Sequence, residues 1–254
     1  MPTRAETKIW RSLRRRKRRD AHRLFLAEGP KLVEEMLDWP GRIVRVLANE
    51  ETPENGPIFR LLDRAMTRGV RAELVPEKVL EAIADTESPG AVLAIGEIPD
   101  VGWGDVGRGL IVVLDGVQDP GNTGTLIRTA AALGACAVVG VGPAADPWGP
   151  KALRASAGAT FKVPAFRAKR EKTAAALANR DVPIWIATAK GEPLSRRIES
   201  PGALALVLGS EAHGVSNVFA QVAARTVGVK LHANVESLNV AAAGAILLDR
   251  LASD

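Results

Sequence analysis

Three turns in this 254-residue chain carry polar side chains among glycine and other small residues: DGVQDPGNTG (115–124), GSEAHGVS (209–216) and HANVESLN (232–239). Their chemistry-bearing residues are Asp115, Asn122 and the nearby Arg128, then Ser210, Glu211 and His213, then Asn234, Glu236, Ser237 and Asn239. Carboxylate, amide and guanidinium groups of this kind can bind an anionic substrate and accept a proton. Each residue alone could equally be a helix cap or a solvated turn residue. Three such turns in one chain indicate a ligand site.

The first turn follows the apolar run LIVVLDG and precedes a helix that we expect from about Thr123 to Leu133. Strand, glycine turn and helix are the usual layout of a phosphate site, because N–H groups at a helix N-terminus attract anions. The stretch has no Walker lysine, but the helix carries Arg128 among alanines. Small neighbours leave room for its guanidinium to bind a phosphate or carboxylate, although such side chains usually extend to solvent.

From residue 110 onward, apolar β-type runs alternate with helical segments. We expect strands at LIVVLD, CAVVGV, FKVPAF, PIWIAT, ALALVLG and TVGVKL, and helices at 123–133, KALRASAG, EKTAAALAN, NVFAQVA and LNVAAAGAILLDRL. Near-continuous apolarity predicts a parallel sheet covered on both faces, and such sheets bind ligands beyond the carboxyl ends of their strands. All three turns follow such ends. The pattern alone therefore predicts an open, doubly wound α/β fold.

Residues 1–99 are predicted to form a separate, small α/β domain, with helices at KLVEEML, IFRLLDRAMTRG and EKVLEAIAD and strands at RIVRVLAN, AELVP and GAVLAIGEI. We interpret DVGWGDVGRG (100–109) as a linker and 110–254 as the second domain. The linker contains the pattern G-x-G-x-x-G. A dinucleotide site needs that pattern after a strand, whereas here it precedes one.

The composition, with 46% hydrophobic residues, fits a globular protein with a sizeable core. The single cysteine, Cys136, excludes an internal disulfide and lies in an apolar run where a structural thiol is expected. Three scattered histidines predict no metal site. No apolar run reaches the roughly 18 residues of a membrane span, and the basic N-terminus lacks a signal peptide's apolar segment. We expect a cytoplasmic protein.

The excess positive charge is concentrated at the N-terminus. Residues 1–31 contain eleven Lys or Arg against three acidic residues, an excess of eight, so the rest carries −3 within a net charge of +5. The densest part is SLRRRKRRDAHR (12–23). A solvated helix face or a flexible basic arm would explain it, but so dense a cluster beside a nearly neutral body favours contact with nucleic-acid phosphates.

Three longer segments, LDGVQDPGNTGTLIRTAAALGA, LVLGSEAHGVS and VKLHANVESLNVAAAGAILL, resemble in order and spacing the motifs of the SpoU/TrmH family of SPOUT methyltransferases. The resemblance covers residues 110–251. Residues 1–99 are similar to the substrate-binding domain of many of these enzymes, which resembles an RNA-binding ribosomal protein. The family transfers a methyl group from S-adenosylmethionine to a ribose 2′-hydroxyl of RNA. Its parallel sheet has a C-terminal trefoil knot, a feature that pattern reasoning argues against because knots are rare.

The resemblance implies roles for ten residues. Catalytic roles fall on Asn122, Arg128, Glu211, Ser237 and Asn239, and cofactor contacts on Gly209, Val229, Leu238, Leu208 and Ser210. Many members have Asn at Ser210 and Pro at Lys230, and Lys230 restores a backbone N–H that could loosen the cofactor loop. Since the cofactor has no phosphate, we expect the DPGNTG backbone donors, Asn122 and Arg128 to hold RNA instead.

The resemblance also implies a homodimer whose RNA site spans a two-fold interface that includes the last helix. The type of front domain favours ribosomal RNA, especially of the large subunit, over transfer RNA. A guanidinium stays protonated in proteins, which favours Arg128 as a clamp on the target phosphate over a base, with the proton leaving through that phosphate or Glu211. A catalytically silent RNA-binding module is one alternative, but it would not need the five catalytic candidates together.

A nicotinamide oxidoreductase is a second alternative. It is suggested by the pattern G-x-G-x-x-A in VVGVGPAAD (138–146). Pro143 and Pro147 interrupt the helix start that such a site requires, and no acidic residue follows at the expected spacing of about 20 positions.

Overall fold

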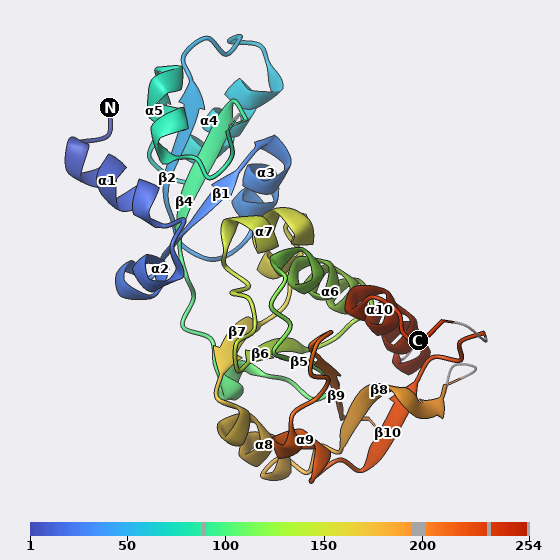
Figure 1. Ribbon diagram of the computed structural model, residues 1–254. Helices are drawn as coiled ribbons and strands as arrows, with labels where there is room; N and C mark the ends of the chain where they lie inside the picture. The colour runs from blue at the N-terminus through green and yellow to red at the C-terminus, as the bar shows by residue number, and fades with distance from the viewer. Residues whose placement is uncertain (88–89, 195–201, 233–234, 253–254) are drawn as a thin grey trace. The chain divides into compact units, whose positions relative to one another are not determined.

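The computed structural model describes residues 1–87, 90–194, 202–232 and 235–252, so Asn234 lies outside the described residues. The chain divides into two compact units, with elements labelled in Figure 1. The first unit comprises Met1–Asp100 and Trp148–Phe161, and the second comprises Val101–Pro147 and Lys162–Asp254. No helix within the described ranges is long and apolar enough to cross a membrane.

The first unit is built on a four-stranded sheet in the order β1-β4-β2-β3. The strands are β1 (Leu24–Glu28), β2 (Ile43–Asn49), β3 (Ala72–Val75) and β4 (Val92–Glu97). Strand β4 is antiparallel to β1 and β2, and β3 is parallel to β2. The helices are α1 (Arg4–Ser12), α2 (Arg16–His22), α3 (Pro30–Asp38), α4 (Pro57–Thr67) and α5 (Glu77–Ile83).

Helices α1 and α2 and strand β1 were not predicted from the sequence. Helix α1 begins with a capping box, in which Thr3 and Glu6 hydrogen-bond each other's backbone. Strand β1 shows the alternation expected of a strand buried on both faces: Phe25 packs with the cluster under α3 and α4, and Leu26 with the cluster under α1 and α5.

Residues 148–161, including α7 (Pro150–Ser156), belong to the core of the first unit. The Trp148 ring centroid lies 4.9 Å from that of Phe25, and the Phe161 centroid lies 5.4 Å from that of Trp39. The sequence analysis placed this segment in the second domain. It therefore missed that a stretch from the middle of the chain completes the first unit's core.

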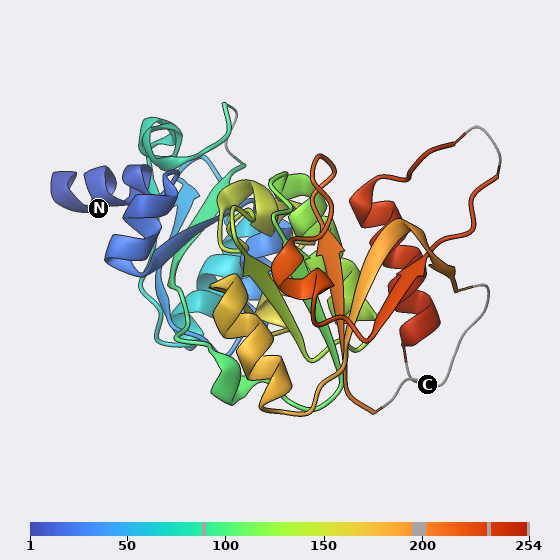
Figure 2. The ribbon, with the colours of Figure 1, turned by 60° about the horizontal axis from the view of Figure 1, so that its bottom comes forward.

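The second unit contains a parallel six-stranded sheet in the order β10-β8-β9-β5-β6-β7, which confirms the predicted sheet type. The strands are β5 (Leu110–Asp115), β6 (Ala137–Val141), β7 (Ala165–Ala168), β8 (Ile184–Pro193), β9 (Leu204–Gly209) and β10 (Arg225–Gly228). Figures 1 and 2 show α6 (Pro120–Ala132) and α10 (Val240–Leu251) on one face, and α8 (Arg170–Ala178) and α9 (Asn217–Ala220) on the other.

Three boundaries in the second unit differ from the prediction. Helix α6 begins at Pro120 rather than Thr123, because Asp119 caps it and proline suits the first helical position. Strand β7 begins at Ala165, after a short 3₁₀ helix over Ala159–Phe161. Residues 101–109 are not a free linker: Trp103 packs edge-on against Phe166 with ring centroids 5.7 Å apart.

Candidate functional site

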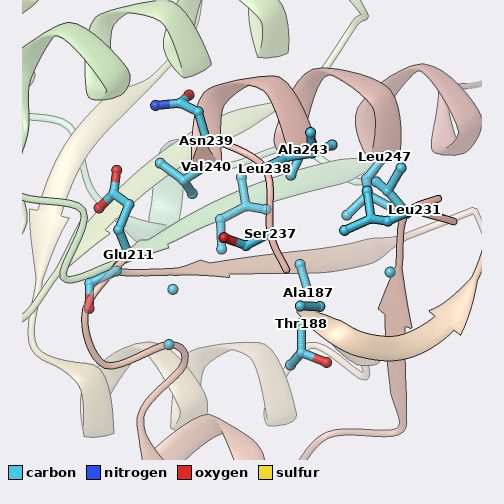
Figure 3. A pocket seen from close by; sticks show the side chains of 17 residues that line it. Ala187, Thr188, Glu211, Leu231, Ser237, Leu238, Asn239, Val240, Ala243 and Leu247 are labelled. Atoms are coloured by element: carbon cyan, nitrogen blue, oxygen red, sulfur yellow. The ribbon is translucent and has the colours of Figure 1, made fainter. Parts of the chain in front are cut away.

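A cavity of about 420 Å³ lies where β9 and β10 end and α10 begins, with β8 as one wall (Figure 3). All five predicted cofactor contacts line it: Leu208, Gly209, Ser210, Val229 and Leu238. Three predicted catalytic residues, Glu211, Ser237 and Asn239, line it as well. The second and third turns of the sequence analysis therefore meet at one cavity.

The cavity lining suits a nucleoside-sized ligand. Its volume falls in the range typical of small-molecule sites. Leu208, Leu231 and Leu247 supply apolar surface for a planar ring, and Figure 3 shows Leu231 and Leu247 at one end with Glu211 at the other. Among the described residues that line it, there is no lysine or arginine. A ligand with positive charge fits this lining better than a pyrophosphate does.

A chain of hydrogen bonds joins all three turns beside the cavity. The Oδ1 atom of Asn239 accepts from the N–H groups of Ala241 and Ala242, so Asn239 caps α10. Its Nδ2 donates to Oδ1 of Asn122 at 3.1 Å, and Nδ2 of Asn122 donates to Oε1 of Glu211 at 2.6 Å. Each amide is oriented by the group before it, and the chain ends on one oxygen of an exposed carboxylate.

The turn that carries Glu211 is tightly closed. The backbone groups of Ser210 and Gly214 bond each other, at 3.2 and 2.8 Å, and the His213 N–H donates to Oγ of Ser210 at 3.1 Å. A Cβ on Gly209 would lie 2.1 Å from the carbonyl carbon of Gly214. Only glycine therefore fits at position 209, because the turn folds directly against it.

Asp115, in the first turn, does not reach the cavity and is held by two partners inside the second unit. It is buried at the end of β5, where Oδ1 accepts from Nε of Arg170 at 2.6 Å and Oδ2 accepts from the Ser216 N–H at 2.7 Å. Arg170 was not predicted from the sequence. It is one of several basic residues around the start of an alanine-rich helix, next to Lys169 and Lys172, and nothing in the sequence distinguishes it from its solvated neighbours.

Arg128 is not brought together with the other candidates. Its side chain is exposed and is not among the residues that line the cavity. Six residues separate it from Asn122 on α6, so it lies about 9 Å along the helix and about 120° around it. In the single chain, the guanidinium therefore faces solvent on a different side of the helix from Asn122.

The first turn differs from the expected phosphate cradle. The Asn122 N–H donates to Oδ1 of Asp119 at 2.8 Å, and the Thr123 N–H donates to the Asp119 carbonyl at 3.0 Å. These two backbone donors are taken by the helix cap, so they are not available to an RNA phosphate. What the turn offers the site is the side chain of Asn122.

Cys136 is half-buried, and burial raises the pKa of its thiol. Its Sγ lies 3.4 Å from the Leu110 carbonyl oxygen. A protonated, partly covered thiol agrees with the expected structural role. Within the described ranges, no cluster of three His, Cys, Asp or Glu could hold a metal ion.

In the first unit, most of the basic N-terminal cluster is exposed, including Arg14, Arg15, Arg16, Lys17 and Arg18. Arg19 is the exception: it is 4% exposed, and its guanidinium donates to the Leu13 carbonyl at 2.7 Å. One arginine of the cluster therefore holds the α1–α2 connection, and the others present charge to solvent.

Both units match families of known proteins. Residues 109–249 match the SpoU rRNA Methylase family, and residues 5–94 match the MRM3-like substrate binding domain. The chain is 32% identical over 247 residues to the 23S rRNA (guanosine(2553)-2′-O)-methyltransferase RlmP of Bacillus subtilis (strain 168), covering 97% of this chain and 95% of that protein.

Solved structures, including the following two, also match nearly the whole chain. One is an AdoMet-bound rRNA methyltransferase from Sinorhizobium meliloti, with a TM-score of 0.85 and 30% identity, covering 99% of this chain and 96% of that one. The other is a putative RNA methyltransferase of the TrmH family from Porphyromonas gingivalis, with a TM-score of 0.82 and 32% identity, covering 99% and 98%.

Proposed function

Since the chain belongs to the SpoU rRNA methylase family, it is an RNA 2′-O-methyltransferase, and we propose that it methylates a ribose 2′-hydroxyl of 23S ribosomal RNA with S-adenosylmethionine as donor. The observation that carries the proposal is the hydrogen-bond chain from Asn239 through Asn122 to Glu211 at the mouth of a cavity without cationic lining among the described residues.

The residues of the cavity fit S-adenosylmethionine. Leu208, Leu231 and Leu238 would cover its adenine ring, the Gly209 and Val229 backbone would approach its polar edges, and Glu211 would face its cationic end. When bound, the cofactor supplies a methyl group on an activated sulfonium. The protein then needs only to align the ribose oxygen and remove its proton.

Glu211 accepts that proton. Asn122 holds Oε1 of the carboxylate at 2.6 Å, which fixes its orientation and leaves the second oxygen for the substrate hydroxyl. When the ribose oxygen accepts the methyl group and the carbon–sulfur bond of the donor breaks, leaving a neutral thioether, the 2′-hydroxyl proton would pass to this second oxygen. Asn122 and Asn239 are positioning residues in this scheme, because each acts through the next group in the chain.

Arg128 binds the phosphate next to the target ribose. It is exposed and away from the cavity of its own chain, so this role requires either RNA that crosses to the outer side of α6 or a second copy of the chain that brings its own Arg128 to the site. A guanidinium binds phosphate with two parallel hydrogen bonds, which lysine cannot match. Exposed Arg14, Arg15 and Arg18 in the substrate-binding unit add affinity for the RNA backbone.

The protein works as a homodimer with its C-terminal region at the interface. Support comes from Val235, a large apolar side chain that is 52% exposed and lies two residues before Ser237 in the chain. Burying such a residue against a second copy would remove apolar surface from water. Light scattering at micromolar concentration should give twice the chain mass, and a monomer mass would contradict the assembly.

The cofactor cavity is formed by a knotted chain. Support comes from the match of residues 109–249 to the SpoU rRNA Methylase family, because the resemblance to that family implies the knot. An experimental density map would test this. A traced backbone without a knot would contradict it.

The proposed reaction is tested by incubating the protein with S-adenosyl-[methyl-³H]methionine and, separately, 23S rRNA, 16S rRNA and total tRNA. We expect label in 23S rRNA alone, and nucleoside digestion should place it on a 2′-O-methyl ribose. Label in tRNA would overturn the substrate class, and label on a base would overturn the reaction. Binding of RNA and cofactor without transfer would favour the silent RNA-binding module.

A further inference from the structure

Asp115 is a buried carboxylate whose two oxygens have different partners. Its side chain is fully buried, Oδ1 pairs with Nε of Arg170, and Oδ2 accepts the Ser216 N–H. Burying a carboxylate is costly unless both charge and hydrogen bonds compensate, so such groups persist where their geometry is needed. Asp115 is therefore a charged anchor at the end of β5, paired with Gly209 at the start of the turn that follows β9.

Arg170 is seated by two glycines that follow neighbouring strands. Gly142, with φ of +62°, follows β6, and a Cβ on it would lie 2.5 Å from the Arg170 guanidinium carbon. Gly116, with φ of +73°, follows β5, and a Cβ there would lie 3.5 Å from a terminal guanidinium nitrogen. Gly142 belongs to the G-x-G-x-x-A pattern of 138–146, so this glycine makes room for an arginine.

Ser216 connects this anchor to the turn of Glu211. The turn is closed on one side by the Ser210–Gly214 pair, and two residues later the Ser216 N–H reaches Asp115. Ser216 is also the N-cap residue of α9, so its backbone is fixed in both directions. The loop that carries the exposed Glu211 is therefore held at Ser216 by a hydrogen bond to the buried carboxylate of Asp115.

We propose that Asp115, held by Arg170, is a positioning residue for methyl transfer, acting through the Ser216 N–H to place the Glu211 turn. The Glu211 carboxylate then has two independent supports: Asn122 holds its oxygen at 2.6 Å, and Asp115 holds the backbone that carries it. This inference rests on the proposed role of Glu211 as proton acceptor.

Asp115→Asn keeps the volume of the side chain but weakens both interactions. An amide oxygen can still accept from Arg170, but the amide nitrogen then faces the Ser216 N–H, donor against donor. Since small misplacements of catalytic groups cost about 100-fold, we expect the single-turnover rate at saturating cofactor to fall about 10- to 100-fold. Hydrogen exchange at the Ser216 amide should become faster, because this N–H would no longer be bonded to a carboxylate.

The decisive readout is a double-mutant cycle with Glu211→Gln. If Asp115 acts by placing Glu211, Asp115→Asn should change the rate of the Glu211→Gln enzyme by less than about threefold, because coupled groups are not additive. Equal losses in both backgrounds, or no loss from Asp115→Asn alone, would overturn the inference. An undiminished rate for Glu211→Gln alone would instead overturn the proton-acceptor role in the proposed function, so the two failures are distinguishable.

Two further variants serve as a substitute for Asp115→Asn and as a control. Arg170→Lys retains the positive charge but not the fixed fork, and it replaces Asp115→Asn in the cycle if that variant does not fold. Glu192→Gln is the control for the loss of one carboxylate charge: it weakens the exposed pair between Glu192 and Arg225, at 2.7 and 3.0 Å in the same sheet, without touching the turn. We expect its methyl-transfer rate to equal that of wild type, and a loss as large as that of Asp115→Asn would overturn the inference.

Discussion

Asn239 donates a hydrogen bond from Nδ2 to Oδ1 of Asn122 over 3.1 Å, although 117 residues separate them in the chain. The same Asn239 side chain caps α10 through its other amide atom. The start of α10 and the side chain beside Glu211 are therefore held by one residue. Asn239 therefore contributes both to the stability of α10 and to the proposed catalytic arrangement, and substitutions can separate these two contributions.

Asn239→Asp should separate the two roles. Aspartate is as good a helix cap as asparagine, so the midpoint of thermal unfolding should stay close to that of wild type. The new carboxylate would face Oδ1 of Asn122, acceptor against acceptor, and a flipped Asn122 would lose its bond to Glu211. We expect methyl transfer to fall at least tenfold. Asn239→Ala, the comparison, should lose the cap as well, at about 1 kcal/mol of stability.

Asn122→Ala and Arg128→Ala should abolish methyl transfer while the dissociation constant of S-adenosylmethionine, measured by calorimetry, stays within a few-fold of wild type. Neither side chain lines the cavity. Arg128 is exposed, so its removal should change stability by no more than about 0.5 kcal/mol. Loss of cofactor binding by a folded Arg128→Ala protein would contradict the division between RNA and cofactor residues. An undiminished rate for Arg128→Lys would remove the two-bond clamp.

A larger side chain at Ala243 should block the cofactor. Ala243 lines the cavity from α10, whereas its neighbour Ala242 is exposed and does not. We expect Ala243→Leu to weaken S-adenosylmethionine binding at least tenfold and Ala242→Leu to leave it unchanged. A bulky residue at Gly209 should also abolish binding, but it would displace the Gly214 backbone and unfold the turn. The Ala243 and Ala242 pair therefore gives the cleaner test.

The N-terminal arginines should supply RNA affinity rather than chemistry. Replacing Arg14, Arg15 and Arg18 by Gln should flatten the log-log salt dependence of RNA binding by about 0.7 to 0.9 for each phosphate that is no longer neutralised. Gln at three exposed basic residues elsewhere in the unit, Arg60, Arg71 and Lys78, is the charge-matched control. An unaltered slope in the first variant would mean that the cluster is only a solvated face.

Deleting residues 1–100 is a poorer test of the same point. The deletion would remove the partners of Trp148, Leu153 and Phe161, which complete the core of the first unit. We therefore expect the truncated protein to expose these apolar side chains and aggregate, whatever the role of the arginines.

Acid should weaken the first unit through Glu73. Burial raises the pKa of Glu73, but hydrogen bonds from the N-terminal ammonium group and Arg45 outweigh it, so the pKa is lowered from its usual 4.5. A lowered pKa contributes stability above pH 4.5 that is lost as the pH falls through the folded-state value. Glu73→Gln should unfold at a lower temperature than wild type at pH 7, and the difference should shrink at pH 3. A difference independent of pH would contradict this.

The sequence could predict the second unit well because its signals are local. Continuous apolar strands indicated a parallel sheet, and the second and third turns led to residues of one cavity. The contribution of Trp148 and Phe161 to the other unit was beyond prediction, because an aromatic residue says nothing about which core it joins. The same holds for the Asp115–Arg170 pair, whose partners lie 55 residues apart and meet only through strand order.

The most direct test of the catalytic assignment is the single-turnover rate of methyl transfer to 23S rRNA by Glu211→Gln, measured from the preformed complex with saturating S-adenosylmethionine. Glutamine keeps the size of the side chain and an oxygen for Asn122 to bond, but it cannot take up the ribose proton at neutral pH. We expect the rate to fall by about 100-fold or more, the usual contribution of a positioned base, and saturating cofactor keeps any loss of cofactor affinity out of this rate. A rate equal to that of wild type would contradict the assignment of Glu211 as the proton acceptor.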